Sequence, residues 1–213
     1  MNEPTGKYIV VEGPVGVGKT TLAQRLARSL NSDLLLETPE ENPFLSRFYE
    51  QPRQYALPTQ LFFLFQRARQ IQSMQQADLF APVRISDFLL DKDRLFAELT
   101  LTPEELNLYN QVHQHLAVEA PTPDLVIYLQ APAHVLLQRI ARRGLAFERR
   151  ISEDYLNRLV EAYVRFFHRY DAAPLLIVNA TEIDLANDEA DYAALLERVR
   201  QAPPGRQYVN LRY

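Results

Sequence analysis

A glycine-rich segment near the amino end constrains the fold of this chain more than any other feature. Its spacing is Gly-x-x-x-x-Gly-Lys-Thr, and its residues are Gly13, Pro14, Val15, Gly16, Val17, Gly18, Lys19, Thr20 and Thr21. An apolar run at residues 8–11 precedes the segment, and leucines at helical spacing (Leu22, Leu26, Leu30) follow it. A buried strand, a tight loop and a helix are the context in which this spacing binds the phosphates of a nucleotide.

The chemistry of the segment predicts a site for ATP and Mg²⁺. Glycine lets the backbone fold closely around a phosphate chain, because no Cβ stands in the way. Successive backbone N–H groups and the positive end of the helix dipole then attract the phosphates. Lys19 is expected to bridge the β- and γ-phosphates, and the Thr20 hydroxyl is expected to hold Mg²⁺. The segment alone does not say which group receives the phosphate.

Composition excludes several other classes of function. The formal net charge is −4 over 213 residues, which argues against a surface that binds a nucleic acid polymer. There is no cysteine, so disulfides and thiol catalysis are excluded, and a cytoplasmic location is expected. The amino end lacks the shape of a signal peptide, and no apolar run is long enough to span a membrane.

Strands that alternate with helices predict one α/β domain over residues 1–213, with a five-stranded parallel sheet covered by helices on both faces. The predicted strands are residues 8–11, 33–37, 83–87, 124–129 and 175–178. The predicted helices are residues 22–30, 44–50, 59–77, 88–99, 103–118, 132–143, 153–170 and 188–201. Pro52 and Pro58 are expected to bracket a break, and the tail at 203–213 to be extended without an assigned role.

Two acidic residues end predicted strands. Glu37 ends the second strand and Asp87 ends the third, and ligands collect at the carboxyl ends of parallel strands. We therefore expect both carboxylates to face the phosphate-binding segment. A carboxylate there can accept a proton from an attacking hydroxyl or bind Mg²⁺ through water. A single strand-end acid is often just solvated, but two beside a phosphate loop favour a role in catalysis.

The helix from residue 59 carries Gln60 and Arg67 on one stripe, nearly two turns apart. A glutamine side chain has an acceptor and two donors, which suits pairing with the edge of a nucleobase. Neighbouring phenylalanines (Phe62, Phe63, Phe65) are ordinary core residues or apolar walls for a planar ring.

Five arginines fall within twelve residues of this net-acidic chain: Arg139, Arg142, Arg143, Arg149 and Arg150. Their density predicts a lid, at about residues 143–151, that closes on the transferred phosphate, with Gly144 as a hinge. An ordinary exposed helix bearing surface arginines is the alternative interpretation.

Several further segments resemble the deoxynucleoside kinases, in particular the bacterial deoxyadenosine and deoxyguanosine kinase type. The resemblance lies in Glu-Asn-Pro-Phe-Leu at 41–45, Phe-Tyr-Glu at 48–50 and the run at 56–64. It continues in Ser86-Asp87-Phe88, in Phe96-Ala97 and in Arg139-Ile140-x-x-Arg143-Gly144, and so covers nearly the whole chain. The fold that it implies is that of the P-loop nucleoside and nucleotide kinases.

The resemblance also implies roles for individual residues. Glu37 would hold the 5′-hydroxyl of an acceptor deoxynucleoside, and Asp87 would act as a base or as a magnesium partner. Tyr49 and Glu148 would recognise the 3′-hydroxyl. Gln60, aided by Arg67, would pair with the base. Arg139 and Arg143 would contact the ATP phosphates, and members of the family generally form homodimers.

The sequence departs from the pattern of the family in two places. Many members carry arginine directly after the acid of the third strand, where this chain has Phe88; Arg84 or a lid arginine is expected to take its place. The lid often reads Arg-Gly-Arg, and here it reads Arg143-Gly144-Leu145. An acidic residue that reads the base falls at Asp91 or Asp93, and the sequence does not choose between them.

The function that the sequence supports is phosphoryl transfer from ATP·Mg²⁺ to the 5′-hydroxyl of a deoxyribonucleoside, with a purine preferred on the family likeness alone. Thymidylate kinase is the nearest rival, but it typically has an Asp-Arg pair after the third strand. A nucleotide-dependent switch is the rival from another class. A guanine-specific switch has Asn-Lys-x-Asp at a later strand end, and this chain has Val178-Asn179-Ala180-Thr181.

Overall fold

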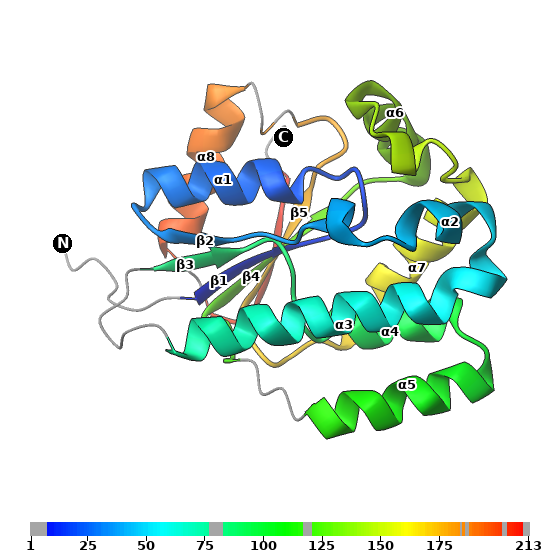
Figure 1. Ribbon diagram of the computed structural model, residues 1–213. Coiled ribbons are helices and arrows are strands. Elements are labelled where there is room, and N and C mark those ends of the chain that lie inside the picture. The colour runs from blue at the N-terminus through cyan, green and yellow to red at the C-terminus, as the bar shows by residue number, and fades with distance from the viewer. Residues whose placement is uncertain are drawn as a thin grey trace.

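The computed structural model describes residues 8–76, 83–116, 121–183, 185, 188–201 and 204–210. In this part of the chain, six strands form one sheet in the order β2-β3-β1-β4-β5-β6, and each strand runs parallel to its neighbours (Figure 1). The strands are β1 (Tyr8–Glu12), β2 (Asp33–Leu35), β3 (Arg84–Ser86), β4 (Leu125–Gln130), β5 (Leu175–Asn179) and β6 (Arg206–Val209).

Helices connect these strands. They are α1 (Lys19–Ser29), α2 (Leu45–Glu50), α3 (Pro52–Gln76), α4 (Lys92–Thr100), α5 (Pro103–Leu116), α6 (Ala133–Arg143), α7 (Glu153–Arg169) and α8 (Glu189–Gln201), with short 3₁₀ turns η1 (Pro39–Glu41) and η2 (Ala146–Glu148). In Figure 1, α1 and α8 lie on one side of the sheet, and α3, α4 and α5 lie on the other. None of the described helices has both the length and the apolar character that crossing a membrane requires.

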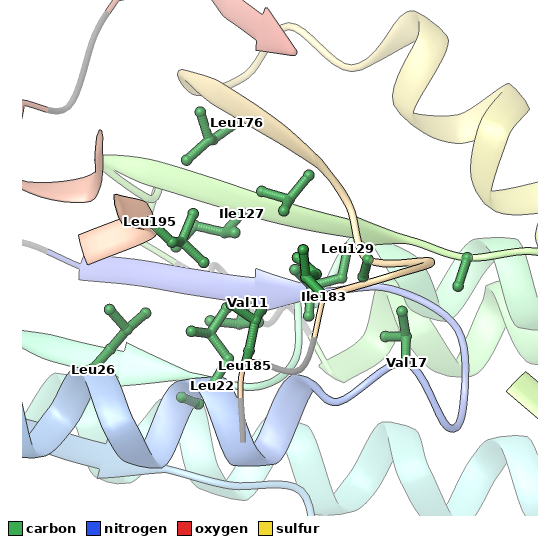
Figure 2. Close-up of a cluster of buried hydrophobic side chains, with 14 of the residues drawn as sticks. Val11, Val17, Leu22, Leu26, Ile127, Leu129, Leu176, Ile183, Leu185 and Leu195 are labelled. Atoms are coloured by element: carbon green, nitrogen blue, oxygen red, sulfur yellow. The ribbon is translucent and has the colours of Figure 1, made fainter. Parts of the chain in front are cut away.

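The strands bury both faces because their side chains alternate between two cores. Ile9 and Val11 of β1 join a cluster with α1, α6 and α8, part of which is drawn in Figure 2. Tyr8 and Val10 point the other way and pack with residues of α4 and α7. Residues 8–11 of the central strand are therefore buried and apolar on both faces, as their run predicted, and the last residue of the strand, Glu12, is a buried acid.

A sixth strand corrects the predicted count of five. β6 pairs in parallel with β5, with Leu175 opposite Arg206 and Val178 opposite Val209. The tail was expected to be extended, but its pairing was missed because Arg206-Gln207-Tyr208 has no apolar run. β6 lies at the edge of the sheet, so of its four residues only Val209 is buried, and Tyr208 is 72% exposed. Residues 203 and 211–213 of the predicted tail lie outside the described residues.

Two predicted helix boundaries were also wrong. α3 begins at Pro52, where a missing N–H costs nothing, and continues through Pro58. The side-chain amide of Asn42, at the end of η1, donates to the Thr59 carbonyl at 3.2 Å and so attaches the segment before α2 to this helix. The predicted ends of this helix at 77 and of α5 at 118 lie outside the described residues.

The segment between β3 and α4 was predicted as helix from Phe88, but α4 begins at Lys92. Side chains capture the backbone of this segment instead. The Ser86 hydroxyl donates to the Phe88 carbonyl at 2.8 Å and accepts from the Phe88 N–H at 3.1 Å. The Leu89 N–H donates to Glu12 Oε2 at 2.8 Å. These bonds compete with helical pairing and bring the start of α4 against the end of β1.

The strand order places the functional residues. Order along the sheet reverses at β1, which has β3 on one side and β4 on the other. The carboxyl ends of β1, β2 and β3 therefore open on one crevice, as expected for ligand sites in sheets of this kind.

Candidate active site

The phosphate-binding loop is formed by backbone rather than by side chains. Gly13 and Gly16 have φ of 150° and 83°, values that residues with a side chain rarely adopt. A Cβ on Gly13 would lie 2.5 Å from the Leu129 carbonyl oxygen of β4, and one on Gly16 would lie 2.8 Å from Ile140 of α6. Gly18 faces open space and lines the cavity that follows. The loop is thus packed on its outer side and free on the side where α1 begins.

Lys19 lies over this loop. Its ammonium donates to the carbonyl oxygens of Gly13 at 2.8 Å and Pro14 at 3.3 Å. Burial lowers the pKa of Lys19, and the positive charge of Lys92 lowers it further, against the opposing effect of the carboxylates of Glu12, Glu37 and Asp87. A phosphate group would stabilise the charged form of Lys19, because it offers an anionic partner in place of two neutral carbonyls.

Thr20 and Asp87 meet at the mouth of the loop. The Thr20 hydroxyl donates to Asp87 Oδ2 at 2.5 Å. A hydroxyl and a carboxylate beside a phosphate site are the oxygen ligands that Mg²⁺ prefers, and Mg²⁺ takes few ligands from protein when a nucleotide supplies others. Among the described residues no group of three or more His, Cys, Asp or Glu could hold a metal ion.

Glu37 and Asp87 lie together, as expected of two strand-end acids, although β2 already ends at Leu35 and β3 at Ser86, so both acids follow their strands instead of ending them. The Glu37 N–H donates to Asp87 Oδ1 at 2.8 Å. Burial raises the pKa of Asp87, although its hydrogen bonds from Thr20 and from the Glu37 backbone act in the opposite direction. Burial would also raise the pKa of Glu37, but Arg67, Lys92 and Lys19 outweigh it and hold that pKa at about 2. One carboxylate is therefore firmly ionised, and the other takes up a proton more readily than an ordinary aspartate.

Arg67 connects this pair of acids to the opposite wall. Its Nε donates to Glu37 Oε1 at 2.8 Å, and it also forms an ion pair with Asp93 of α4. Asp93 is buried, whereas Asp91 is exposed, so the structure brings Asp93 rather than Asp91 into the arginine network. Gln60 lies nearly two helical turns before Arg67 on α3 and lines the same cavity, together with Phe63 and Phe96.

Three buried polar residues of the site were not predicted. Glu12 Oε1 accepts hydrogen bonds from the Gly13 N–H at 2.8 Å and the Tyr163 hydroxyl at 2.9 Å. The ammonium of Lys92 lies 3.4 Å from Glu12 Oε2 and 3.6 Å from Glu37 Oε2. An acid as the last residue of an apolar strand was a signal for Glu12. No local signal distinguished Lys92 or Tyr163, because each belongs to a helix with the usual mixture of polar and apolar residues.

The predicted lid residues separate in the structure. Arg143, the last residue of α6, pairs with Glu148 of η2, and both line the cavity with Tyr49. Burial raises the pKa of Tyr49 well above its usual value, with Tyr155 and Glu148 adding to the effect, so it keeps its proton at neutral pH. Arg139 instead donates to the Ala180 carbonyl at 2.7 Å and reaches the Val17 carbonyl at 3.5 Å. Arg150 pairs with Glu50 of α2 at 3.2 Å.

The cations beside Glu37 differ from those expected. Arg84 begins β3 next to Tyr8 and Asp33, at the amino end of the sheet, and does not line the cavity. The lid arginine Arg143 is engaged with Glu148. Among the described residues, Arg67 and Lys92 form the ion pairs with Glu37.

These residues enclose one cavity of about 160 Å³. It runs from the phosphate loop, past Glu37 and Asp87, to the wall formed by Gln60 and Arg67. Of the residues proposed from sequence, those that line it are Val15, Gly16, Gly18, Lys19, Thr20, Thr21, Glu37, Tyr49, Gln60, Arg67, Asp87, Arg143 and Glu148. A phosphate loop, a place for Mg²⁺ and carboxylates facing a closed pocket define a P-loop phosphotransferase for a small acceptor.

Comparison with known proteins gives the family. The sequence profile described as "Deoxynucleoside kinase" matches residues 9–202. The chain therefore belongs to the deoxynucleoside kinase family, and it is an enzyme with deoxynucleoside kinase activity. Members of this family take the phosphoryl group from a nucleoside triphosphate.

The chain is similar in sequence to individual relatives along most of their length. The chain is 32% identical over 203 residues to deoxyguanosine kinase of Bacillus subtilis, covering 92% of this chain and 98% of the relative. It is 27% identical over 204 residues to deoxyadenosine/deoxycytidine kinase of the same organism, covering 92% and 93%. A solved structure of deoxyadenosine kinase from M. mycoides, with dCMP and dCDP bound, superposes with a TM-score of 0.77 at 25% identity, covering 91% of this chain and 97% of that one.

Proposed function

We propose that this protein transfers the terminal phosphoryl group of ATP to the 5′-hydroxyl of a purine deoxyribonucleoside. The observation that carries the proposal is the convergence of Glu37 and Asp87 on Thr20 and Lys19 at one end of a closed pocket. An acceptor hydroxyl that enters from the side of Gln60 meets the carboxylates before it meets the phosphate loop.

On the donor side, the backbone N–H groups of the loop that are not already engaged, from Gly16 and from Gly18 to Thr21, would bind the phosphates, and Lys19 would leave its two carbonyl partners to bind them too. Thr20 and Asp87 would hold Mg²⁺, which supplies positive charge to the phosphate oxygens when it is bound. Arg143 completes the donor site in our proposal, and Arg139 would have to leave the carbonyls of Ala180 and Val17 to join it. Arg143 would exchange Glu148 for phosphate as the lid, residues 143–151, closes.

On the acceptor side, Glu37 stays ionised at neutral pH and is fixed by Arg67, so it can accept a hydrogen bond from the 5′-hydroxyl. Holding that oxygen in line with the phosphate supplies much of the rate enhancement in phosphoryl transfer. Asp87, which accepts a hydrogen bond from Thr20, would serve either as the Mg²⁺ partner or, in place of Glu37, as the group that receives the proton of the hydroxyl.

The remaining contacts would select the nucleoside. Gln60 and Arg67, with Asp93 behind Arg67, face the space for the base, and Phe63 and Phe96 form apolar walls for a planar ring. Tyr49 and Glu148 would bind the 3′-hydroxyl from the lid side. A purine preference is supported by the names of relatives, among them deoxyguanosine kinase of Bacillus subtilis and deoxyadenosine kinase of Lactobacillus acidophilus.

The test is an acceptor panel of the four natural deoxynucleosides with ATP and Mg²⁺, with products separated by chromatography. We expect the fastest conversion with a purine and the phosphate on the 5′-oxygen, which phosphorus–proton coupling in NMR locates. An acceptor lacking the 5′-hydroxyl should give no product. Preferred conversion of thymidine would overturn the purine assignment. Preferred conversion of a nucleoside monophosphate, or equal ATP hydrolysis without acceptor, would overturn the proposed reaction.

We also propose that the protein forms a homodimer, on the family resemblance. Light scattering with size-exclusion chromatography tests this directly: a mass near twice 24.6 kDa is expected, and a monomer mass at micromolar concentration would contradict it.

A further inference from the structure

A buried lysine that lines the cavity lies between two acidic residues, Glu12 and Glu37. Lys92 is the first residue of α4 and is only 2% exposed. Lysine is almost never so deeply buried unless its charge is paired. Lys92 lines the cavity together with Glu37, Asp87 and Lys19, so its ammonium faces the region where the acceptor and the phosphate would meet.

The two acidic partners of Lys92 are held very differently. Glu12 belongs to β1 and is saturated, because its oxygens accept from the Gly13 N–H, the Leu89 N–H and the Tyr163 hydroxyl. It is a fixed anchor directly under the phosphate loop. Glu37 has one oxygen, Oε1, bound by Arg67, while Oε2 is the oxygen nearest to Lys92. Lys92 thus connects the base of the phosphate loop to the carboxylate of the acceptor site.

The distances leave the lysine available for a further contact. Its ammonium is 3.4 Å from Glu12 and 3.6 Å from Glu37, both longer than a good hydrogen bond. An ammonium has three donors, and the contacts to the two carboxylates are loose. The nearby positive charge of Lys19 opposes that of Lys92, so both cations favour the arrival of an anion or a polar oxygen between them.

We propose that Lys92 is a positioning residue for phosphoryl transfer, which holds the Oε2 oxygen of Glu37 toward the acceptor hydroxyl by bridging it to Glu12 beneath the phosphate loop. The inference rests on the proposed function, because it takes Glu37 to be the residue that binds the 5′-hydroxyl. It adds one residue, Lys92, which acts through Glu37 and connects the phosphate loop with the acceptor site.

The experiment compares Lys92→Met, Lys92→Arg and the matched control Arg94→Met. Arg94 lies two residues further along α4, with a side chain 80% exposed and paired with Glu98 alone among the residues described. For each variant, kcat, the KM of the deoxynucleoside and the Kd of ATP are measured, and thermal unfolding confirms the fold. We expect Lys92→Met to lower kcat/KM for the nucleoside by about thirtyfold, with the Kd of ATP within about threefold of wild type. Lys92→Arg should recover to within about fivefold of wild type, and Arg94→Met should match wild type.

A double-variant cycle shows whether Lys92 acts through Glu37. If it does, Lys92→Met should have little further effect in a Glu37→Gln background. Independent, multiplicative losses would overturn the inference, as would a folded Lys92→Met enzyme with normal kcat/KM, or Lys92→Arg as impaired as Lys92→Met. Should Lys92→Met fail to fold, Glu12→Gln/Lys92→Met removes opposite charges together and carries the same comparison. Failure of the proposed function is distinct, because the wild-type enzyme itself would then form no 5′-monophosphate.

Discussion

The donor half and the acceptor half of the cavity are built by different means. The donor half is one continuous segment, Gly13 to Thr21, whose shape comes from backbone angles that glycine permits. The acceptor half collects charged side chains from four separate places: Glu37 after β2, Arg67 on α3, Asp87 after β3, and Lys92 with Asp93 on α4. Between them lies the hydrogen bond from Thr20 to Asp87.

This difference has energetic consequences. A backbone loop that binds phosphate depends on steric freedom, so adding a Cβ should be the most harmful change there. A buried network of charges depends on balance, so removing one partner leaves another buried and uncompensated. The donor half should therefore be most sensitive to added side-chain atoms, and the acceptor half to the removal of a charged group. The variants below test this difference.

Arg67→Met should have the largest effect on stability. It leaves Asp93 buried without its cation and Glu37 with Lys92 as its remaining partner among the described contacts. We expect the free energy of unfolding to fall by about 3–5 kcal/mol, measured by urea denaturation. Arg94→Met is the control, since its exposed pair with Glu98 should contribute less than about 0.5 kcal/mol. A loss below about 1 kcal/mol for Arg67→Met would show that this ion pair does not hold the acceptor half together.

Asp87→Asn should separate chemistry from folding. The asparagine oxygen can still accept from the Glu37 N–H, and its amide NH₂ can donate to the Thr20 hydroxyl oxygen in place of the lost acceptor, so the fold should survive. We expect kcat to fall by about a hundredfold or more, because the negative charge that receives the proton or supports Mg²⁺ is gone. Steady-state kinetics with a thermal unfolding control measure this. Near-normal turnover would show that Asp87 is neither base nor metal partner.

Gly13→Ala tests the donor half. The added Cβ would lie 2.5 Å from the Leu129 carbonyl, a backbone atom that cannot move aside cheaply, and φ is 150°. We expect a loss of about 2 kcal/mol in the free energy of unfolding and weaker ATP binding. Gly205→Ala is a control with positive φ and open space around it, and it should cost about 1 kcal/mol without affecting ATP. Equal effects of the two changes would remove the steric argument for the loop.

Gln60→Ala should have the smallest effect and the most selective one. The loss of a hydrogen-bonding side chain at the base should raise the KM of the nucleoside about tenfold while the Kd of ATP stays unchanged. Gln72→Ala, at an exposed position of the same helix, is the matched control. Unchanged nucleoside affinity for Gln60→Ala would exclude Gln60 from the base site, and a matching loss of ATP affinity would indicate general damage to the cavity.

Most of the architecture was predictable because its signals are local. Apolar runs marked five of the strands, and the glycine spacing marked the phosphate loop. The failure before α4 combines a local and a distant cause. Ser86 binds the backbone of Phe88 nearby, while Glu12, far away in sequence, accepts from the Leu89 N–H, and together they hold this segment in a non-helical form. β6 was missed since an edge strand needs little apolar character.

Taken alone, the sequence determined the kind of chemistry and its main participants. A loop that binds phosphate, two acids at strand ends and a polar stripe on an apolar helix can all be recognised within short windows. Only the tertiary structure decided how the charges are paired. In the fold, Arg67 pairs with Asp93 and not with Asp91, and Arg139 donates to a carbonyl just after β5. Lys92 lies between Glu12 and Glu37. The reason is physical: a buried charge takes its partners from whatever the fold brings within a few ångströms, and sequence spacing carries little information about those distances.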